Sequence, residues 1–198
     1  MTEPVNPATR SRSLRRGIQL EWTTLGWNVV GVIVLVYLSI SASSVALAGF
    51  GLDSFIEIGA STVVLWELSG TGAARQRRAL RLIGIAFIAL AIYLTAQSAI
   101  ALITLHHAAQ SIAGITWTAI TALVMFLLAA GKGRVGRALG NPVLITEGRV
   151  TFIDGLLAVA VLLGLALNFA FGWWWADPIA GFVIVYYAIR EAVHIFRA

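Results

Sequence analysis

Six long apolar stretches constrain the fold of this chain more than any other feature of its sequence. A helix that crosses a bilayer needs about 20 predominantly apolar residues. Stretches of about that length cover residues 20–41, 44–68, 80–105, 112–130, 143–171 and 178–196. Very short connections at 41–43, 106–111 and 172–177 would make consecutive helices antiparallel neighbours. The sequence therefore predicts an all-α integral membrane protein with six transmembrane helices.

The composition supports a membrane protein and excludes several other classes. Apolar residues make up 59% and charged residues 12% of the chain, whereas soluble domains have about half and about a quarter. The net charge of +5 fits basic rims that meet anionic lipid, and no basic run is interleaved with aromatic residues as in a nucleic-acid site. Because the chain has no cysteine, disulfides, thiolate metal sites and thiol redox motifs are excluded.

The basic residues predict how the helices are oriented. They form clusters at Arg10, Arg12, Arg15 and Arg16; Arg75, Arg77, Arg78 and Arg81; Lys132, Arg134, Arg137 and Arg149; and Arg190 and Arg197. An even number of apolar stretches lies between clusters, so all of them can face the cytoplasm, where short loops carry an excess of lysine and arginine. We expect both termini to be cytoplasmic, with a basic lead-in at 1–19 and a six-helix transmembrane domain at 20–198. The lead-in shows no signal-peptide cleavage site.

Two local patterns give more specific expectations about the ends of the helices. Residues 69–78 and 131–141 are basic and are expected to be the inner connections. Asp177 and Pro178 are typical of a helix start, so we expect Asp177 to cap the last helix.

Three carboxylates fall near the middle of the bilayer and indicate the function. Asp53 and Glu57 are four residues apart on one helix face, and Asp154 lies at a similar depth in the fifth stretch. Each such acid costs roughly 2.5–3.5 kcal/mol on insertion scales, and we expect no lysine or arginine at their depth to pair with them. They are then either protonated and hydrogen-bonded between helices, or they bind a cation. Three acids at one depth favour the cation site.

Two further acids have weaker claims to a functional role. Glu147 lies seven residues before Asp154 on the same helix face, so it is a possible entrance ligand. An acid is also favoured near a helix N-terminus for electrostatic reasons alone. Glu21 lies at an inner helix end, where a rim salt bridge explains it.

Two segments resemble the cation diffusion facilitator (cation efflux) family. One is SSVALAGFGLDSFIEIGASTVVLWEL at 43–68, which is similar to the second helix of that family, and the other is TEGRVTFIDGLLAVAVLLGLALNFAFGWWWADPIAG at 146–181, which is similar to its fifth helix and the start of its sixth. The resemblance implies export of divalent metals against protons through a midplane site on helices two and five. It also implies a short form of the family, without the soluble C-terminal domain.

The resemblance implies that Asp53, Glu57 and Asp154 are three of the four metal ligands. The fourth is normally a histidine, and its position here is Val150, which cannot bind metal. Zinc prefers nitrogen and sulfur ligands, so the remaining oxygen ligands shift the expected ion toward manganese, with iron, cobalt and zinc as alternatives.

The sequence as a whole predicts a multi-pass transporter of divalent cations in a bacterial-type inner membrane. It would use protons as counter-ion, need no cofactor and work by alternating access, and a homodimer would form through its transmembrane domain. The alternative is a non-transporting homologue that binds metal or a partner. Enzyme activity is not expected, because no nucleophile–base pair or histidine cluster lies at membrane depth.

Overall fold

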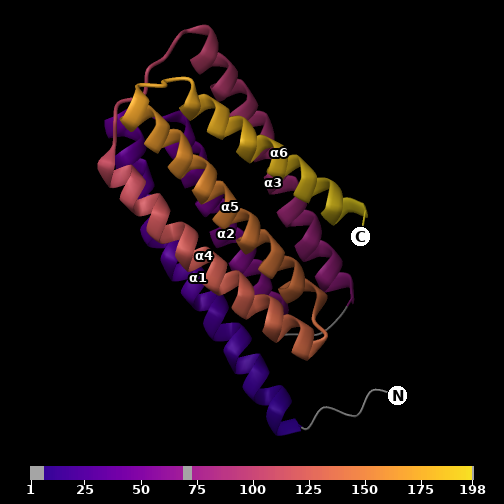
Figure 1. The fold of residues 1–198 in the computed structure, drawn as a ribbon. Coiled ribbons are helices and arrows are strands. Elements are labelled where there is room, and N and C mark those ends of the chain that lie inside the picture. Colours follow the sequence, from indigo (N-terminus) through magenta and orange to yellow (C-terminus); the bar gives the residue numbers. More distant parts are fainter. Residues whose placement is uncertain (1–6, 69–72, 198) are drawn as a thin grey trace.

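The structure is a computed structural model that describes residues 7–68 and 73–197, and all regular structure in these ranges is helical (Figure 1). The helices are α1 (Pro7–Ala42), α2 (Val45–Leu68), α3 (Ala73–Ile103), α4 (Ile112–Leu139), α5 (Pro142–Phe171) and α6 (Ala176–Arg197). Each of these six is long and apolar enough to cross a membrane. The prediction of an all-α protein with six membrane-spanning helices is therefore confirmed.

The helices form a bundle with α2 and α5 at its centre. Helix α2 packs against α1, α3, α5 and α6, and α5 packs against α2, α3, α4 and α6. The most extensive contacts join α1 with α2, α4 with α5, and α3 with α6, and the last pair runs along one side of the bundle (Figure 1). The start of α1, the α4–α5 connection and the end of α6 lie toward one end of the bundle, which we call the inner end.

Helix α4 is longer than expected, and the prediction of a connection at 131–141 is wrong. The helix continues to Leu139, and Gly140 ends it in the left-handed conformation with φ 61°. Asn141 then caps α5, because its side chain accepts a hydrogen bond from the amide of Leu144. Lysine and arginine are good helix formers, so the basic segment continues the helix and the connection shrinks to a tight turn. Helix α1 likewise begins at Pro7, within the expected lead-in.

Two glycines, Gly136 of α4 and Gly148 of α5, allow these helices to pack closely at the inner end. A Cβ atom on Gly148 would lie 2.9 Å from the backbone nitrogen of Gly133, and one on Gly136 would lie 2.9 Å from the backbone nitrogen of Ile145. Side chains at these positions would therefore force the two helices apart. Residues of α4 beside this contact are brought directly against α5.

Asp177 stabilises a different helix from the one expected. Helix α6 begins at Ala176, and the Asp177 carboxylate accepts hydrogen bonds from the hydroxyl of Ser44 and from the amide of Ala46. Ser44 in turn accepts a hydrogen bond from the amide of Leu47. The α1–α2 turn lies beside the start of α6 and leaves free amides there, so Asp177 caps α2 and links it to α6 at the outer end.

A candidate cation site between α2 and α5

The two central helices face each other along a row of buried polar side chains, which we call the α2–α5 ladder. Its members are Asp53, Glu57 and Ser61 on α2 and Glu147, Thr151 and Asp154 on α5. The residues of each helix are three or four positions apart, so they share one helix face. Since α2 and α5 are antiparallel, Asp53 lies opposite Asp154, Glu57 opposite Thr151 and Ser61 opposite Glu147.

Each pair of the ladder brings together one side chain from each central helix. Thr151 Oγ1 donates to Glu57 Oε1 at 2.7 Å. At the inner end, Ser61 Oγ donates to Glu147 Oε1 at 3.5 Å. At the outer end, the carboxyl groups of Asp53 and Asp154 face each other. The ladder is thus made of oxygen ligands, which are the ligands that hard divalent cations prefer.

Asp154 stands out because its carboxyl group faces another carboxyl group, that of Asp53. Among the residues that the structure describes, no hydroxyl, amide or basic side chain bonds to either carboxyl oxygen of Asp154, although the side chain is buried. A buried carboxylate without a partner is costly and is expected to bind something or to be protonated. This unsatisfied carboxyl group, opposite Asp53, is the feature that most favours a ligand site.

A buried lysine lies beside the inner half of the ladder, contrary to expectation. Lys132 of α4 is 0% exposed, and its Nζ lies 3.2 Å from Glu147 Oε1, 3.9 Å from Glu57 Oε1 and 3.2 Å from Glu21 Oε2. It also donates to Thr151 Oγ1 at 3.0 Å. The prediction that no basic residue pairs with these carboxylates is wrong, because α4 continues into the basic segment and carries Lys132 into the bundle.

Glu21 and Glu147 take part in the same buried charge cluster. Both are 0% exposed. Glu21 is therefore not in a rim position, and helix-end electrostatics alone does not describe the surroundings of Glu147. Removing one partner of a buried ion pair costs about 3–5 kcal/mol, because it strands the other charge. With Glu57, these acids give Lys132 three carboxylate neighbours from three helices.

The predicted metal ligands are brought to the two facing helices but are not closed around a single point. Asp53, Glu57 and Asp154 are all buried in the ladder. Within residues 7–68 and 73–197, however, no group of three acidic, histidine or cysteine side chains is close enough to hold a metal ion. Val150 is 2% exposed and packs in the hydrophobic core. Its neighbour Thr151 supplies the ladder contact to Glu57.

Sequence reasoning missed the roles of four members of this region, although three of them carried a signal. Ser61 lies four residues after Glu57, and Thr151 lies four after Glu147, so helical spacing placed both on the face of the predicted ligands. Lys132 had a weaker signal in its flanking glycines, which favour close helix packing. The fourth, Glu21, had none, since its role depends on Lys132.

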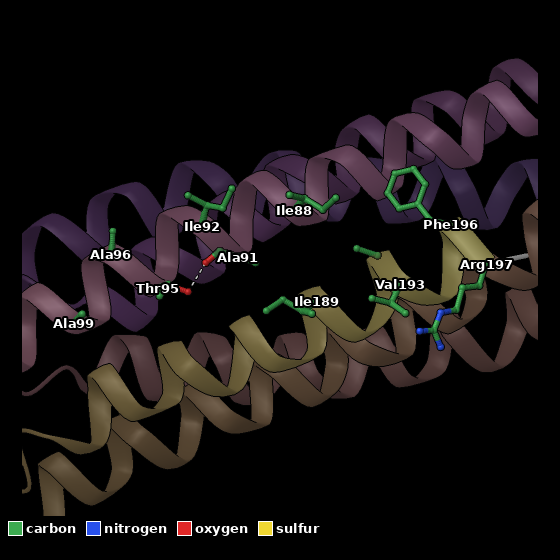
Figure 2. Close-up of a pocket in the computed structure, with 11 residues that line it drawn as sticks. Ile88, Ala91, Ile92, Thr95, Ala96, Ala99, Ile189, Val193, Phe196 and Arg197 are labelled. Atoms are coloured by element: carbon green, nitrogen blue, oxygen red, sulfur yellow. Dashed lines mark hydrogen bonds between the residues drawn. The ribbon is translucent and has the colours of Figure 1, made fainter.

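A groove of about 780 Å³ lies elsewhere, between α3 and α6 (Figure 2). Its lining is apolar apart from Thr95 and Arg197, and the Thr95 hydroxyl is bonded to the carbonyl oxygen of Ala91. Ile92 and Ile189 on its walls are well exposed, as expected for surfaces in contact with lipid. The groove lacks carboxylates, so it does not compete with the ladder as a cation site.

Comparisons with known proteins show the family of the chain. A family model described as the cation efflux transmembrane domain matches residues 81–198. A probable cation efflux system protein of Mycobacterium tuberculosis is 32% identical over 187 residues, covering 85% of this chain and 53% of the relative. Transmembrane protein 163 of Xenopus laevis is 22% identical over 159 residues, covering 75% and 54%. The chain thus spans about half the length of these curated relatives.

Proposed function

The chain belongs to the cation efflux family and is a multi-pass membrane protein, and from this we propose that it transports divalent metal cations. The single observation that carries the proposal is the pair of Asp154 and Asp53 carboxyl groups, buried opposite each other between the two central helices without a basic side chain bonded to Asp154. Asp53, Glu57 and Asp154 would supply oxygen ligands to the ion. An intramembrane acid that faces the interior of a bundle is by default a functional-site candidate.

The transport cycle follows from the position of these acids. A metal ion that arrives from the inner end would displace protons from the carboxyl groups, and opening to the other side would release it and let protons return. Glu147, at the inner end of the ladder, would act as an entrance ligand. Because the proposed ligands are oxygens, manganese is the expected ion, with iron, cobalt and zinc as alternatives. No resident cofactor and no enzymatic step is part of this proposal, and homodimer formation stays a prediction.

A non-transporting relative that binds metal or a partner is the second candidate. It is favoured by the buried Lys132, which supplies a positive charge beside Glu57, and by the absence of a closed group of three ligands in the described part of the chain. Such a protein would bind divalent ions without moving them. Binding and flux must therefore be measured on the same sample.

Flux of Mn²⁺ into liposomes with an imposed proton gradient tests the proposal. We expect Asp53→Asn and Asp154→Asn each to abolish flux while the protein stays folded, because each removes one charge and keeps the side-chain shape. Glu147→Gln should reduce flux only partly. Glu191→Gln is the matched control, because Glu191 is a buried acid on α6 outside the ladder. Collapse of the proton gradient should slow the wild type.

Two results would decide against this proposal. Normal flux in both aspartate variants would mean that the buried acids are structural. Mn²⁺ binding that is lost in Asp53→Asn, together with no flux in the wild type under any gradient, would identify the non-transporting alternative. Size-exclusion profiles of all variants establish that a loss of flux is not a loss of fold.

A further inference from the structure

Lys132 contacts two kinds of carboxylate, and they are not equivalent. Glu21 and Glu147 are its near partners, each 3.2 Å from Nζ. Glu57 is farther away, at 3.9 Å, and of the three it is the proposed ligand at the midplane site, whereas Glu147 is proposed only as an entrance ligand. The Lys132 ammonium group therefore acts on the cation site through Glu57 and is held in place by Glu21 and Glu147.

The same oxygen of Glu57 is engaged twice by the protein. Glu57 Oε1 accepts a hydrogen bond from Thr151 at 2.7 Å and also lies 3.9 Å from Lys132 Nζ. A divalent cation coordinated by this oxygen would be repelled by an ammonium group a few ångströms away in a medium of low polarity. Glu57 can bind the ion strongly only after Lys132 has moved away from it.

Two observations show that Lys132 can give up Glu57 without becoming a stranded charge. Its near partners, Glu21 and Glu147, are fully buried and supply two carboxylates for one ammonium. Each also has at least one buried oxygen without a hydrogen-bond partner in the described chain. These free oxygens can accept hydrogen bonds from the Lys132 ammonium group when it moves away from Glu57.

We propose that Lys132 is a tethered cation that occupies Glu57 while the ladder is empty and releases it to an incoming divalent metal ion. After release, the ammonium group stays between Glu21 and Glu147. This inference rests on the proposed function, since it names the residue that sets the cation affinity of the same site. Lys132 is a positioning residue here, because it acts on the ion through Glu57.

Isothermal titration of Mn²⁺ into the purified protein in detergent at one pH tests the inference. Lys132→Gln frees Glu57, so this variant should bind Mn²⁺ at least about tenfold more tightly than the wild type. A tenfold change in affinity corresponds to about 1.4 kcal/mol. Glu147→Gln should weaken binding, because Lys132 then depends more on Glu57. Arg149→Gln is the control for charge, since Arg149 is an exposed residue of α5, and it should leave the affinity unchanged.

The double variant Lys132→Gln/Glu147→Gln separates release of Glu57 from general electrostatics. Its net charge equals that of the wild type, so an electrostatic background alone predicts wild-type affinity. The tethered cation predicts tighter binding, because Glu57 is free in the double variant. The double variant also provides the test if Lys132→Gln alone fails to fold, because it leaves one buried carboxylate fewer without a partner. Wild-type affinity in the double variant would overturn the inference.

Asp53→Asn distinguishes failure of this inference from failure of the proposed function. If Asp53→Asn loses Mn²⁺ binding while the Lys132 variants match the wild type, the ladder is a metal site and only the tethered cation is wrong. If Asp53→Asn binds Mn²⁺ as the wild type does, the proposed metal site is wrong. No binding by any variant would overturn both.

Discussion

At the scale of single residues, Thr151 connects the charges of the ladder. Its hydroxyl group donates to Glu57 Oε1 and accepts from Lys132 Nζ, so one side chain satisfies an acid and a base at once. Buried charges are tolerated only when such hydrogen bonds complete their surroundings. Thr151 therefore contributes to stability as well as to the position of Glu57.

Replacing this hydroxyl group should have a measurable cost. We expect Thr151→Val to lower the stability by about 1–3 kcal/mol, because Glu57 loses a buried hydrogen-bond donor. Thr118→Val is the matched control: Thr118 is also fully buried, but its hydroxyl group bonds to the carbonyl oxygen of Gly114 in its own helix. Thermal unfolding in detergent compares the two. Equal shifts of the midpoint would mean that the Thr151 hydroxyl has no special role.

The neighbouring Val150 shows what could and could not be predicted for single residues. The spacing of Asp53, Glu57 and Asp154 placed these acids on two helices, and the structure places them in the ladder. The ligand position implied by family resemblance fell on Val150, whereas Thr151 makes the contact to Glu57. Residues three and four positions before Asp154 lie on nearly the same helix face, so spacing alone does not decide which of them points at the partner helix.

At the scale of helices, the contact between α4 and α5 decides where Lys132 lies. Gly148 lets the two backbones approach so closely that a Cβ atom on it would lie 2.9 Å from the backbone nitrogen of Gly133. The sequence did not predict this, because a glycine-rich basic segment is typical of a loop when it is considered alone. Packing against α5 overrides that local tendency, which is why α4 continues beyond its expected end.

A methyl group at this contact should destabilise the bundle. We expect Gly148→Ala to cost about 1–3 kcal/mol, because the helices must separate to admit it. Gly59→Ala is the control, since a Cβ atom at Gly59 of α2 would meet nothing within 4 Å, and it should be neutral or stabilising by about 0.5–1 kcal/mol. Thermal unfolding followed by the fluorescence of the seven tryptophans gives both values. A higher midpoint for Gly148→Ala would contradict the packing described above.

At the scale of the whole molecule, composition and periodic apolar stretches were enough to predict the class of fold. Bilayer thickness sets the length of a spanning helix, so six stretches of that length indicate six spans with little ambiguity. The short connections predicted that consecutive helices are neighbours, which is right for α1 with α2 and for α5 with α6 but wrong for α3 with α4. The other pairs were not predictable, because lipid-facing and protein-facing surfaces are both apolar. The central position of α2 and α5 came from the structure.

The orientation of the bundle in the membrane is a prediction of the basic clusters. In this chain without cysteine, we expect Arg137→Cys, at the inner end of α4, to be labelled by an impermeant thiol reagent only after the membrane is permeabilised. Ala109→Cys, in the exposed α3–α4 connection, should be labelled in intact cells. The reason is the excess of arginine at the inner end. Labelling of Arg137→Cys from outside would reverse the orientation.

The link between Asp177 and the start of α2 holds that helix at one end. Its outer end is fixed to α6 by the bonds of Asp177 to Ser44 and Ala46, so α2 can tilt most readily about that point. Asp53 and Ser61 lie 9 and 17 residues from Ser44, or about 14 and 26 Å along the helix at 1.5 Å per residue. A tilt about that point would therefore move Ser61 about twice as far as Asp53 and would widen the ladder most at its inner end.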